Sequence, residues 1–251
     1  MGINETIKNS YLESVLISFI KIKELESIFK NKQEGNLFNI FASLIENIEK
    51  NCQIYSSINE FKKMKDPQKR KVKKFTHNEI IEYIIKILHK ELNKSEEKEK
   101  EKEKEKEKEK EKNKISYKSF EEYINNFNKY NNSIIQKLFF GFYKCDFICK
   151  KCNNKELSIY NHFYIKCFDL SSKKETTIND LINNNEEIIK KECPNCKNDY
   201  NITNYINEEL PDILVMCFSN KENCILKDYK NILKINEESY NIISFIANVE
   251  I

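Results

Sequence analysis

Four cysteines in this 251-residue chain have the spacing of metal ligands. They form two C-x-x-C pairs, Cys149 with Cys152 and Cys193 with Cys196, and forty residues separate the pairs. Each pair can hold a metal ion from one tight turn, and two such turns complete the tetrahedral four-thiolate shell of a structural zinc site. The sequence therefore predicts one structural Zn²⁺ bound by Cys149, Cys152, Cys193 and Cys196, with the intervening segment forming a finger held by the metal.

The other five cysteines are expected to serve mostly as small buried hydrophobic residues, because the count is odd and the chain shows no signal peptide. They are Cys52, Cys145, Cys167, Cys217 and Cys224. Cys145 is an alternative ligand, although the two-residue gap is the commoner ligand geometry. No apolar run reaches membrane-spanning length. These features favour an intracellular compartment, cytoplasmic or nuclear, and no membrane partner.

Composition indicates a folded core beneath a charged surface. Hydrophobic residues make up 39% of the chain and charged residues 33%. The 43 basic and 40 acidic residues nearly cancel, leaving a net charge of +3 and no concentrated basic stripe. Nucleic acid is therefore not favoured as a partner.

The first part of the chain is predicted to be helical. Apolar residues recur at helical spacing over residues 11–29, 37–48 and 80–92, and we interpret these stripes as core faces. A run of alternating Glu and Lys follows, and residues 95–116 are predicted to be a disordered insertion because nothing in them can be buried.

The second part has the patterns of strands. Residues 157–167 alternate apolar and polar side chains, the compact apolar run 213–216 is typical of a strand buried on both faces, and residues 240–251 predict another strand. Thr177 is the expected N-cap of a short helix. Helices followed by a zinc-bearing antiparallel sheet predict an α+β fold with segregated layers.

Six motifs follow one another along the chain: residues 2–16, 75–92, 133–141, the two C-x-x-C pairs, 210–216 and 240–248. In this order they resemble the ubiquitin-specific proteases. Residues 2–16 (GINETIKNSYLESVL) are similar to the nucleophile box of that family, and residues 75–92 (FTHNEIIEYIIKILHKEL) to its following helix. Residues 133–141 (SIIQKLFFG) resemble the segment that leads into its fingers, where the C-x-x-C pairs then fall. Residues 210–216 (LPDILVM) and 240–248 (YNIISFIAN) resemble two later strands. Each match alone is weak, and their order across nearly the whole chain carries the resemblance.

The resemblance implies a papain-like right hand with thumb, palm and zinc-ribbon fingers. It divides a single domain, residues 1–251, into a helical thumb (1–94), the Glu/Lys insertion (95–116), fingers with the zinc ribbon (117–210) and palm strands (211–251), C-terminally truncated. It also implies that ubiquitin or a ubiquitinated protein is the partner.

The catalytic positions of that family are replaced in this chain. The resemblance places Ser10 at the position of the nucleophilic Cys, Asn248 at that of the general-base His, and Glu5 at that of the oxyanion-stabilising Asn. A serine hydroxyl is far less acidic than a thiol, and a carboxylate repels a developing oxyanion. We therefore expect a pseudoenzyme that binds ubiquitin or serves as a scaffold.

Alternatives remain open at this point. Ser10 could act with His77 or His89 as its base, although triads are defined by geometry. His162 is expected to face solvent rather than bind metal. The early Met and the end at Ile251, before the strand that would carry the orienting Asp or Asn, suggest an active thiol-dependent deubiquitinase of which this sequence is incomplete. Two C-x-x-C pairs also occur in zinc-stabilised interaction modules unrelated to ubiquitin.

Overall fold

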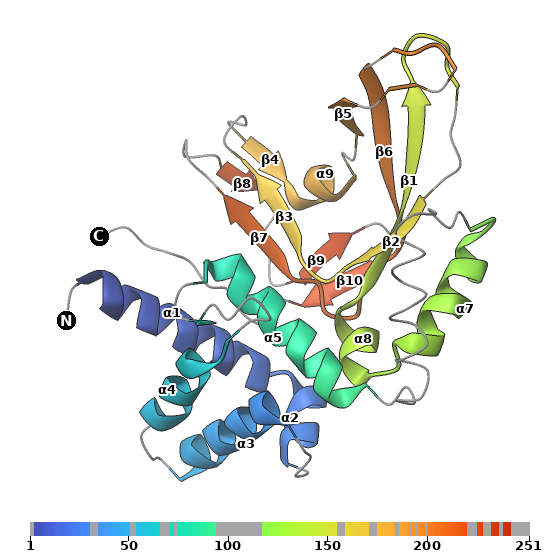
Figure 1. The fold of residues 1–251 in the computed structure, drawn as a ribbon. Coiled ribbons are helices and arrows are strands. Elements are labelled where there is room, and N and C mark those ends of the chain that lie inside the picture. The colour runs from blue at the N-terminus through green and yellow to red at the C-terminus, as the bar shows by residue number, and fades with distance from the viewer. Residues whose placement is uncertain are drawn as a thin grey trace. The chain divides into compact units, whose positions relative to one another are not determined.

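The structure is a computed structural model with helices and strands in two compact units (Figure 1). The first unit comprises residues 1–91, 230–232 and 241–251, and the second comprises residues 92–229 and 233–240. The residues that the structure describes are 3–30, 35–50, 54–65, 71–72, 75–93, 117–154, 159–170, 175–183, 186–190, 192–193, 195–198, 200–219, 225–227, 232–235 and 238–241.

The first unit is built from helices that bury their apolar stripes together. These helices are α1 (Ile3–Ile20), α2 (Lys23–Lys30), α3 (Asn36–Glu49), α4 (Tyr55–Lys63) and α5 (His77–Leu92). Phe29 of α2 stacks on Phe41 of α3 at 4.6 Å between ring centroids and meets Phe38 edge to face at 5.5 Å. All three rings are completely buried, so aromatic packing holds α2 against α3.

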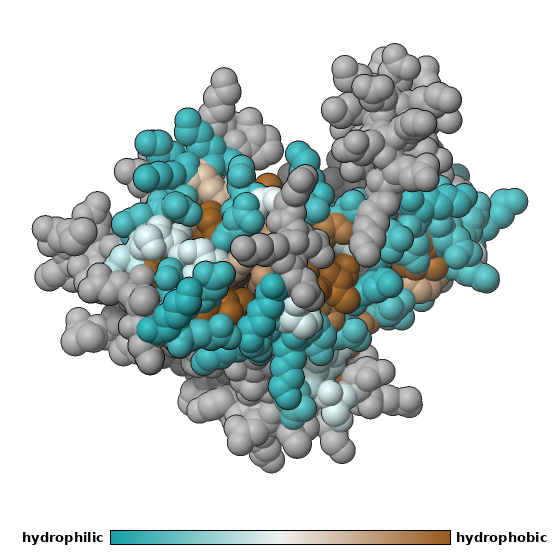
Figure 2. Space-filling model, turned by 90° about the horizontal axis from the view of Figure 1, so that it is seen from below, coloured by the Kyte–Doolittle hydropathy of each residue, from teal (hydrophilic) through white to brown (hydrophobic). Residues whose placement is uncertain are grey.

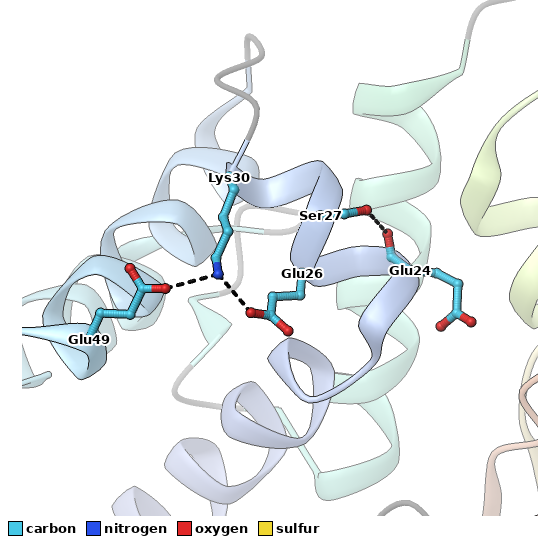
Figure 3. Close-up of polar contacts among 5 residues, drawn as sticks. All are labelled: Glu24, Glu26, Ser27, Lys30 and Glu49. Carbon is cyan, nitrogen blue, oxygen red and sulfur yellow. Dashed lines mark hydrogen bonds and ion pairs between the residues drawn. The ribbon is translucent and has the colours of Figure 1, made fainter.

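Surface charges add a second link between α2 and α3 (Figure 3). The Nζ of Lys30 lies 2.8 Å from Glu26 Oε1 on α2 and 2.9 Å from Glu49 Oε1 on α3. The two carboxylates raise the pKa of Lys30 above its ordinary value. All three side chains are exposed, and exposed ion pairs stabilise proteins little.

A carboxylate from α5 caps the first turn of α3. Glu91 accepts hydrogen bonds from the backbone N–H groups of Leu37 and Phe38, each at 3.0 Å. Gly35, just before the helix, has a φ of 153°, and a Cβ there would lie 2.5 Å from the Glu91 Oε2 atom. The glycine therefore leaves room for the capping carboxylate.

The second unit combines short helices with strands. Helices α7 (Phe120–Tyr130) and α8 (Ile134–Phe139) are each capped by a serine, Ser119 and Ser133, whose hydroxyl accepts a backbone N–H from the first turn. They precede strand β1 (Gly141–Cys149).

A four-stranded sheet in the order β2-β1-β6-β5 forms the longest ladder of this unit. It contains β1, β2 (Ile159–Phe163), β5 (Glu186–Lys190) and β6 (Tyr200–Glu209). All of its pairings are antiparallel, as expected from the sequence, and Figure 1 shows β1 and β6 running side by side.

Two parallel pairs and a short hairpin complete the described strands. β3 (Lys166–Asp169) pairs with β7 (Met216–Ser219), and β4 (Glu175–Thr177) pairs with β8 (Ile225–Lys227). β9 (Ile232–Ile235) pairs with β10 (Glu238–Asn241). Helix α9 (Ile178–Asn183) lies over these pairs, and its N-terminus is capped by Thr177, whose Oγ1 accepts the N–H of Asp180 at 3.0 Å. The predicted N-cap is confirmed.

Several sequence expectations are corrected by these elements. The stripe over residues 11–29 belongs to two helices, α1 and α2, rather than to one. Ile48, expected on a core face, is 40% exposed, because it lies in the last turn of α3. The apolar run 213–216 is half-buried, and the strand begins only at Met216.

The antiparallel expectation missed the two parallel pairs, which join strands distant in sequence. Residues 94–116 and 242–251 lie outside the described residues.

Lys166 on β3 has a partly buried amine without an acidic partner in the described part of the chain. Its Nζ donates to Asn207 Oδ1 at 2.6 Å and lies 4.4 Å from the centroid of the Phe163 ring. Burial lowers its pKa to about 8, since the charged amine loses hydration that a neutral amide and a ring replace only in part.

This low pKa predicts a specific pH dependence of stability. Between pH 8 and the ordinary lysine value of 10.5, the unfolded chain binds more protons at this position than the folded chain, so stability should rise with pH across that window. Lys166→Met should remove this rise and stabilise the fold below pH 8 by about 1 kcal/mol after allowance for solvent screening. Urea unfolding of both proteins from pH 7 to 10 measures the difference. The control Lys129→Met changes an exposed lysine of α7 and should leave the pH dependence as in the wild type.

Among the described residues on the face seen in Figure 2, hydrophilic side chains lie around smaller areas of hydrophobic ones. Among the described residues, the large hydrophobic side chains that stand exposed are Ile48, Tyr55 and Ile206. No helix in the described ranges has the length and apolar character needed to cross a membrane.

Candidate metal centre

Antiparallel pairing of β1 with β6 brings the two C-x-x-C pairs together. Cys149 is the last residue of β1, and its register partner is Asn201, the second residue of β6. The Cys193 pair comes just before β6 begins at Tyr200. The first pair therefore leaves the ladder at the same end at which the second pair enters it.

The two cysteine turns have the same backbone hydrogen bonds. In the first turn, the N–H of Asn153 donates to the Cys149 carbonyl at 2.9 Å, and the N–H of Cys149 donates to the Asn154 carbonyl at 3.0 Å. In the second turn, the N–H of Lys197 donates to the Cys193 carbonyl at 2.9 Å, which matches the first of these bonds.

The repeat extends to the second bond and to the backbone angles. The N–H of Cys193 donates to the Asn198 carbonyl at 2.9 Å. Asn153 and Lys197 both have positive φ values, 53° and 59°, a backbone conformation that residues other than glycine rarely adopt. Such a reversal turns the chain sharply after the second cysteine, so that both sulfurs of a pair point toward one centre.

The four sulfur atoms lie at distances that suit one tetrahedral ion. All lie within 4.8 Å of one another. The Cys149–Cys196 and Cys152–Cys193 distances are 3.4 and 3.7 Å. A tetrahedron with Zn–S bonds of about 2.3 Å has edges of about 3.8 Å. The predicted cluster is confirmed: these cysteines are close enough to bind one metal ion, as a zinc-ribbon site requires.

Burial of the cysteines and nearby hydrogen-bond donors act in opposite directions on the ionisation of the four thiols. Cys149 and Cys193 are buried, and Cys152 and Cys196 are half-buried. Burial opposes ionisation of the Cys149 thiol, but backbone N–H donors of Cys152 and Lys151 and neighbouring thiols outweigh it and lower its pKa to about 6.

Cys196 is affected in the opposite direction. The Asn198 backbone favours its thiolate, but burial and the three neighbouring sulfurs raise its pKa to about 12. Four adjacent sulfurs cannot all ionise without a positive charge between them, whereas a divalent ion favours the deprotonated form of every ligand. A soft, tetrahedral four-sulfur set suits Zn²⁺.

The other candidate ligands are placed elsewhere. Cys145 is not in the cluster, because it lies inside the sheet, where its register partners are Ile159 and Tyr205. His162 is not a ligand in the described cluster either.

The expectation that His162 faces solvent is wrong. Its ring is half-buried, stacks on Phe140 at 5.4 Å with an interplanar angle of 2°, and lies 4.9 Å from Phe127. The imidazole has apolar faces, so strand β2 presents it to the aromatic rings of neighbouring elements rather than to water.

The three catalytic positions that the resemblance assigns fall on α1 and on the C-terminal segment of the chain. Glu5 and Ser10 lie on α1, with side chains outside the description, and Asn248 lies outside it altogether. His77 begins α5, and His89 lies in its last turn. Ser10 is well inside α1, which begins at Ile3, rather than at a helix start, where the helix dipole would assist ionisation. The roles of Glu5, Ser10 and Asn248 stay predictions.

The asparagines that close the two cysteine turns were missed by the sequence reasoning. Their signal was present, because both pairs read C-x-x-C-x-N, with Asn154 and Asn198 two residues after the last cysteine. The carbonyl of each asparagine accepts the N–H of the first cysteine in its turn. Because the backbone carbonyl makes this bond, the position two residues after the second cysteine closes the turn whichever side chain it carries.

Comparison with known proteins identifies the fold through structure rather than sequence. No protein-family model matches the chain, and no curated protein matches it by sequence. Among solved structures, it is similar to a chain of the SAGA DUB module of Ubp8, Sgf11, Sus1 and Sgf73 bound to monoubiquitin, at 13% identity and a TM-score of 0.53, over 84% of this chain.

Two further structures give the same result. A structure of the yeast SAGA DUBm with a mutant Sgf73 matches at 13% identity and a TM-score of 0.54 over 94% of this chain. A SAGA DUB module with a mutant Ubp8 and a shortened Sgf11 matches at 14% identity and a TM-score of 0.52 over 92%. The chain spans just under half the length of these chains, between 46% and 48%. Its mixed helix-and-sheet fold is that of a portion of a chain in the SAGA deubiquitinating module.

Proposed function

We propose that this chain is a ubiquitin-specific-protease-like domain that binds ubiquitin, or a ubiquitinated protein, without cleaving it. The observation that carries the proposal is the fold match over 84% of this chain to a chain of a deubiquitinating module solved with monoubiquitin. The ordered motifs of the sequence support the same family. On this proposal the residue ranges 1–94, 117–210 and 211–251 are thumb, fingers and palm, with the Glu/Lys insertion between the first two.

The metal centre fits a role in binding rather than in chemistry. Four cysteine ligands fill a tetrahedral shell, and a closed shell leaves no position for a substrate or a reactive water. Zn²⁺ bound there would fix the end of the β1–β6 ladder. A finger held at its end offers a rigid surface to a protein partner at a lower entropic cost than a mobile one.

The proposed loss of cleavage depends on three replaced positions. Thiol proteases attack through a thiolate that a histidine activates, and an amide stabilises the oxyanion. Serine at position 10, asparagine at position 248 and glutamate at position 5 supply none of these functions. Loss of a nucleophile or its base alone removes most of the contribution of a triad.

Ubiquitin binding and probe reactivity, measured on the same preparation, test the proposal. We expect titration of the zinc-loaded chain into isotope-labelled ubiquitin to shift a contiguous set of ubiquitin resonances. A ubiquitin probe with a thiol-reactive C-terminus should leave the chain unlabelled while it labels an active deubiquitinase run in parallel.

The outcomes separate the candidate functions. Covalent labelling would contradict the pseudoenzyme proposal and support an active thiol-dependent enzyme. An absence of ubiquitin binding by a folded, zinc-loaded chain would instead support a zinc-stabilised interaction module. An unrelated small protein of similar charge should cause no comparable shifts and serves as the control for non-specific association.

A further inference from the structure

Two cysteines outside the metal centre face each other across a pair of parallel strands. Cys167 of β3 is the register partner of Cys217 of β7. Adjacent strands lie about 4.7–4.9 Å apart, and a disulfide requires Cα atoms about 4.4–6.8 Å apart. Both cysteines are in the reduced, thiol form in the structure. The backbone therefore already holds them at a separation that a disulfide can bridge.

Their side chains lie on the same face of the strand pair. The next residues in register, Phe168 and Phe218, stack with centroids 5.7 Å apart and pack against the buried cluster that contains Ile178. Successive side chains of a strand point to opposite faces, so both cysteines lie on the face away from this cluster. The Cys217 thiol also has a hydrogen bond to the Cys167 side chain.

The two thiols have different surroundings. Cys167 is exposed, so an oxidant in solution reaches it directly, whereas Cys217 is half-buried. Burial, together with the adjacent Cys167, raises the pKa of the Cys217 thiol to about 12. Exposure makes Cys167 the thiol that an oxidant reaches first, and the adjacent Cys217 is then the thiol placed to resolve the oxidised product.

We propose that Cys167 and Cys217 form a redox-active dithiol that a peroxide converts into a disulfide between β3 and β7. The Cys167 thiolate attacks one peroxide oxygen, the O–O bond breaks, and hydroxide leaves to give a sulfenic acid. The Cys217 sulfur then attacks the sulfenic sulfur, the S–O bond breaks, and the departing hydroxide takes the Cys217 proton. Two thiols are oxidised, one peroxide is reduced to two waters, and a dithiol reductant reverses the change. This inference does not depend on ubiquitin binding.

The test uses the full chain loaded with zinc, in a background with Cys52→Ser and Cys224→Ser, since those two cysteines lie outside the described residues. After treatment with hydrogen peroxide, we expect the free-thiol count of the unfolded chain to fall by two and to return with dithiothreitol. Peptide mapping should recover one cross-linked species that joins the peptides of Cys167 and Cys217. The zinc content should remain unchanged.

Two variants make the outcome decisive. Cys217→Ser should abolish the cross-link and leave Cys167 as a sulfenic acid that dimedone traps. Cys145→Ser, which changes a buried cysteine of the metal-bearing strand, should leave the cross-link intact. Circular dichroism shows that each variant is folded. The proposal would be overturned if peroxide oxidised the folded, zinc-loaded chain without joining Cys167 to Cys217. It would also be overturned if Cys167 formed the same amount of cross-link, to another cysteine, in Cys217→Ser.

Discussion

Replacing Cys193 with serine should release the metal and destabilise the second unit by several kcal/mol. Structural zinc sites contribute about 10–16 kcal/mol of binding free energy that is also folding free energy. Cys193 is 2% exposed, and its sulfur lies 3.7 Å from that of Cys152, so a serine leaves a buried hydroxyl beside three cysteines that no longer hold a metal ion. Metal analysis should fall from about one zinc per chain to none, and thermal unfolding should begin at a lower temperature.

A matched control separates loss of the ligand from loss of a buried sulfur. Cys145 is also buried and lies on β1, but it is outside the metal cluster. Cys145→Ser should therefore keep one zinc per chain and lose only about 1 kcal/mol, the effect of placing a hydroxyl in the core. A strong chelator should destabilise the wild type and Cys145→Ser and have little further effect on Cys193→Ser. Equal zinc content in the two variants would show that Cys193 is not a ligand.

The metal ligands could be predicted from sequence because their chemistry is local. A C-x-x-C turn brings two sulfurs together by itself, so that only the meeting of the two turns requires tertiary structure. That meeting depends on the β1–β6 pairing, in which Cys149 is opposite Asn201. Most helices and the antiparallel sheet could also be expected, since periodicity in the sequence reflects burial of one face.

The parallel pairs could not be predicted in the same way. Paired residues of β3 and β7, such as Cys167 and Cys217, are fifty positions apart in the sequence, so no short turn connects the two strands. The apolar run at 213–216 does lead into a strand, but the strand begins only at Met216. Ile213 donates its N–H to the carbonyl of Leu138 instead of to a strand partner. Apolar character alone does not distinguish a segment that is hydrogen bonded to a helix from a strand.

The cap of α3 shows a second limit of local reading. Helix caps are usually sought in the residues that precede the helix, and Gly35 offers no side chain there. The actual cap is Glu91, which is 54 positions beyond Leu37 on another helix. In the sequence Glu91 is one more polar residue in the motif at residues 75–92, and only the fold shows which N–H groups it satisfies.

Glu91→Ala should therefore destabilise the first unit more than any exposed charge substitution in it. The carboxylate accepts two backbone N–H groups of α3, and hydrogen bonds to a charged group contribute about 1.5–3 kcal/mol each where they are partly buried. A negative charge at a helix N-terminus adds about 0.3–1 kcal/mol. Water can replace part of this in the variant, so we expect a loss of about 2–3 kcal/mol in urea unfolding. Hydrogen exchange should accelerate at the amides of Leu37 and Phe38.

Graded variants identify the capping contact as the cause. Glu91→Gln keeps one acceptor oxygen without the charge, so its loss should be smaller, about 1 kcal/mol. Gly35→Ala should imitate Glu91→Ala, because the new Cβ would lie 2.5 Å from Glu91 Oε2 and displace the carboxylate. Glu82→Ala removes an exposed glutamate of the same helix, paired with Lys86, and should cost less than about 0.5 kcal/mol. If exchange at Leu37 and Phe38 were unchanged in Glu91→Ala while the protein lost stability, the carboxylate would act through packing of α5 and not through the cap.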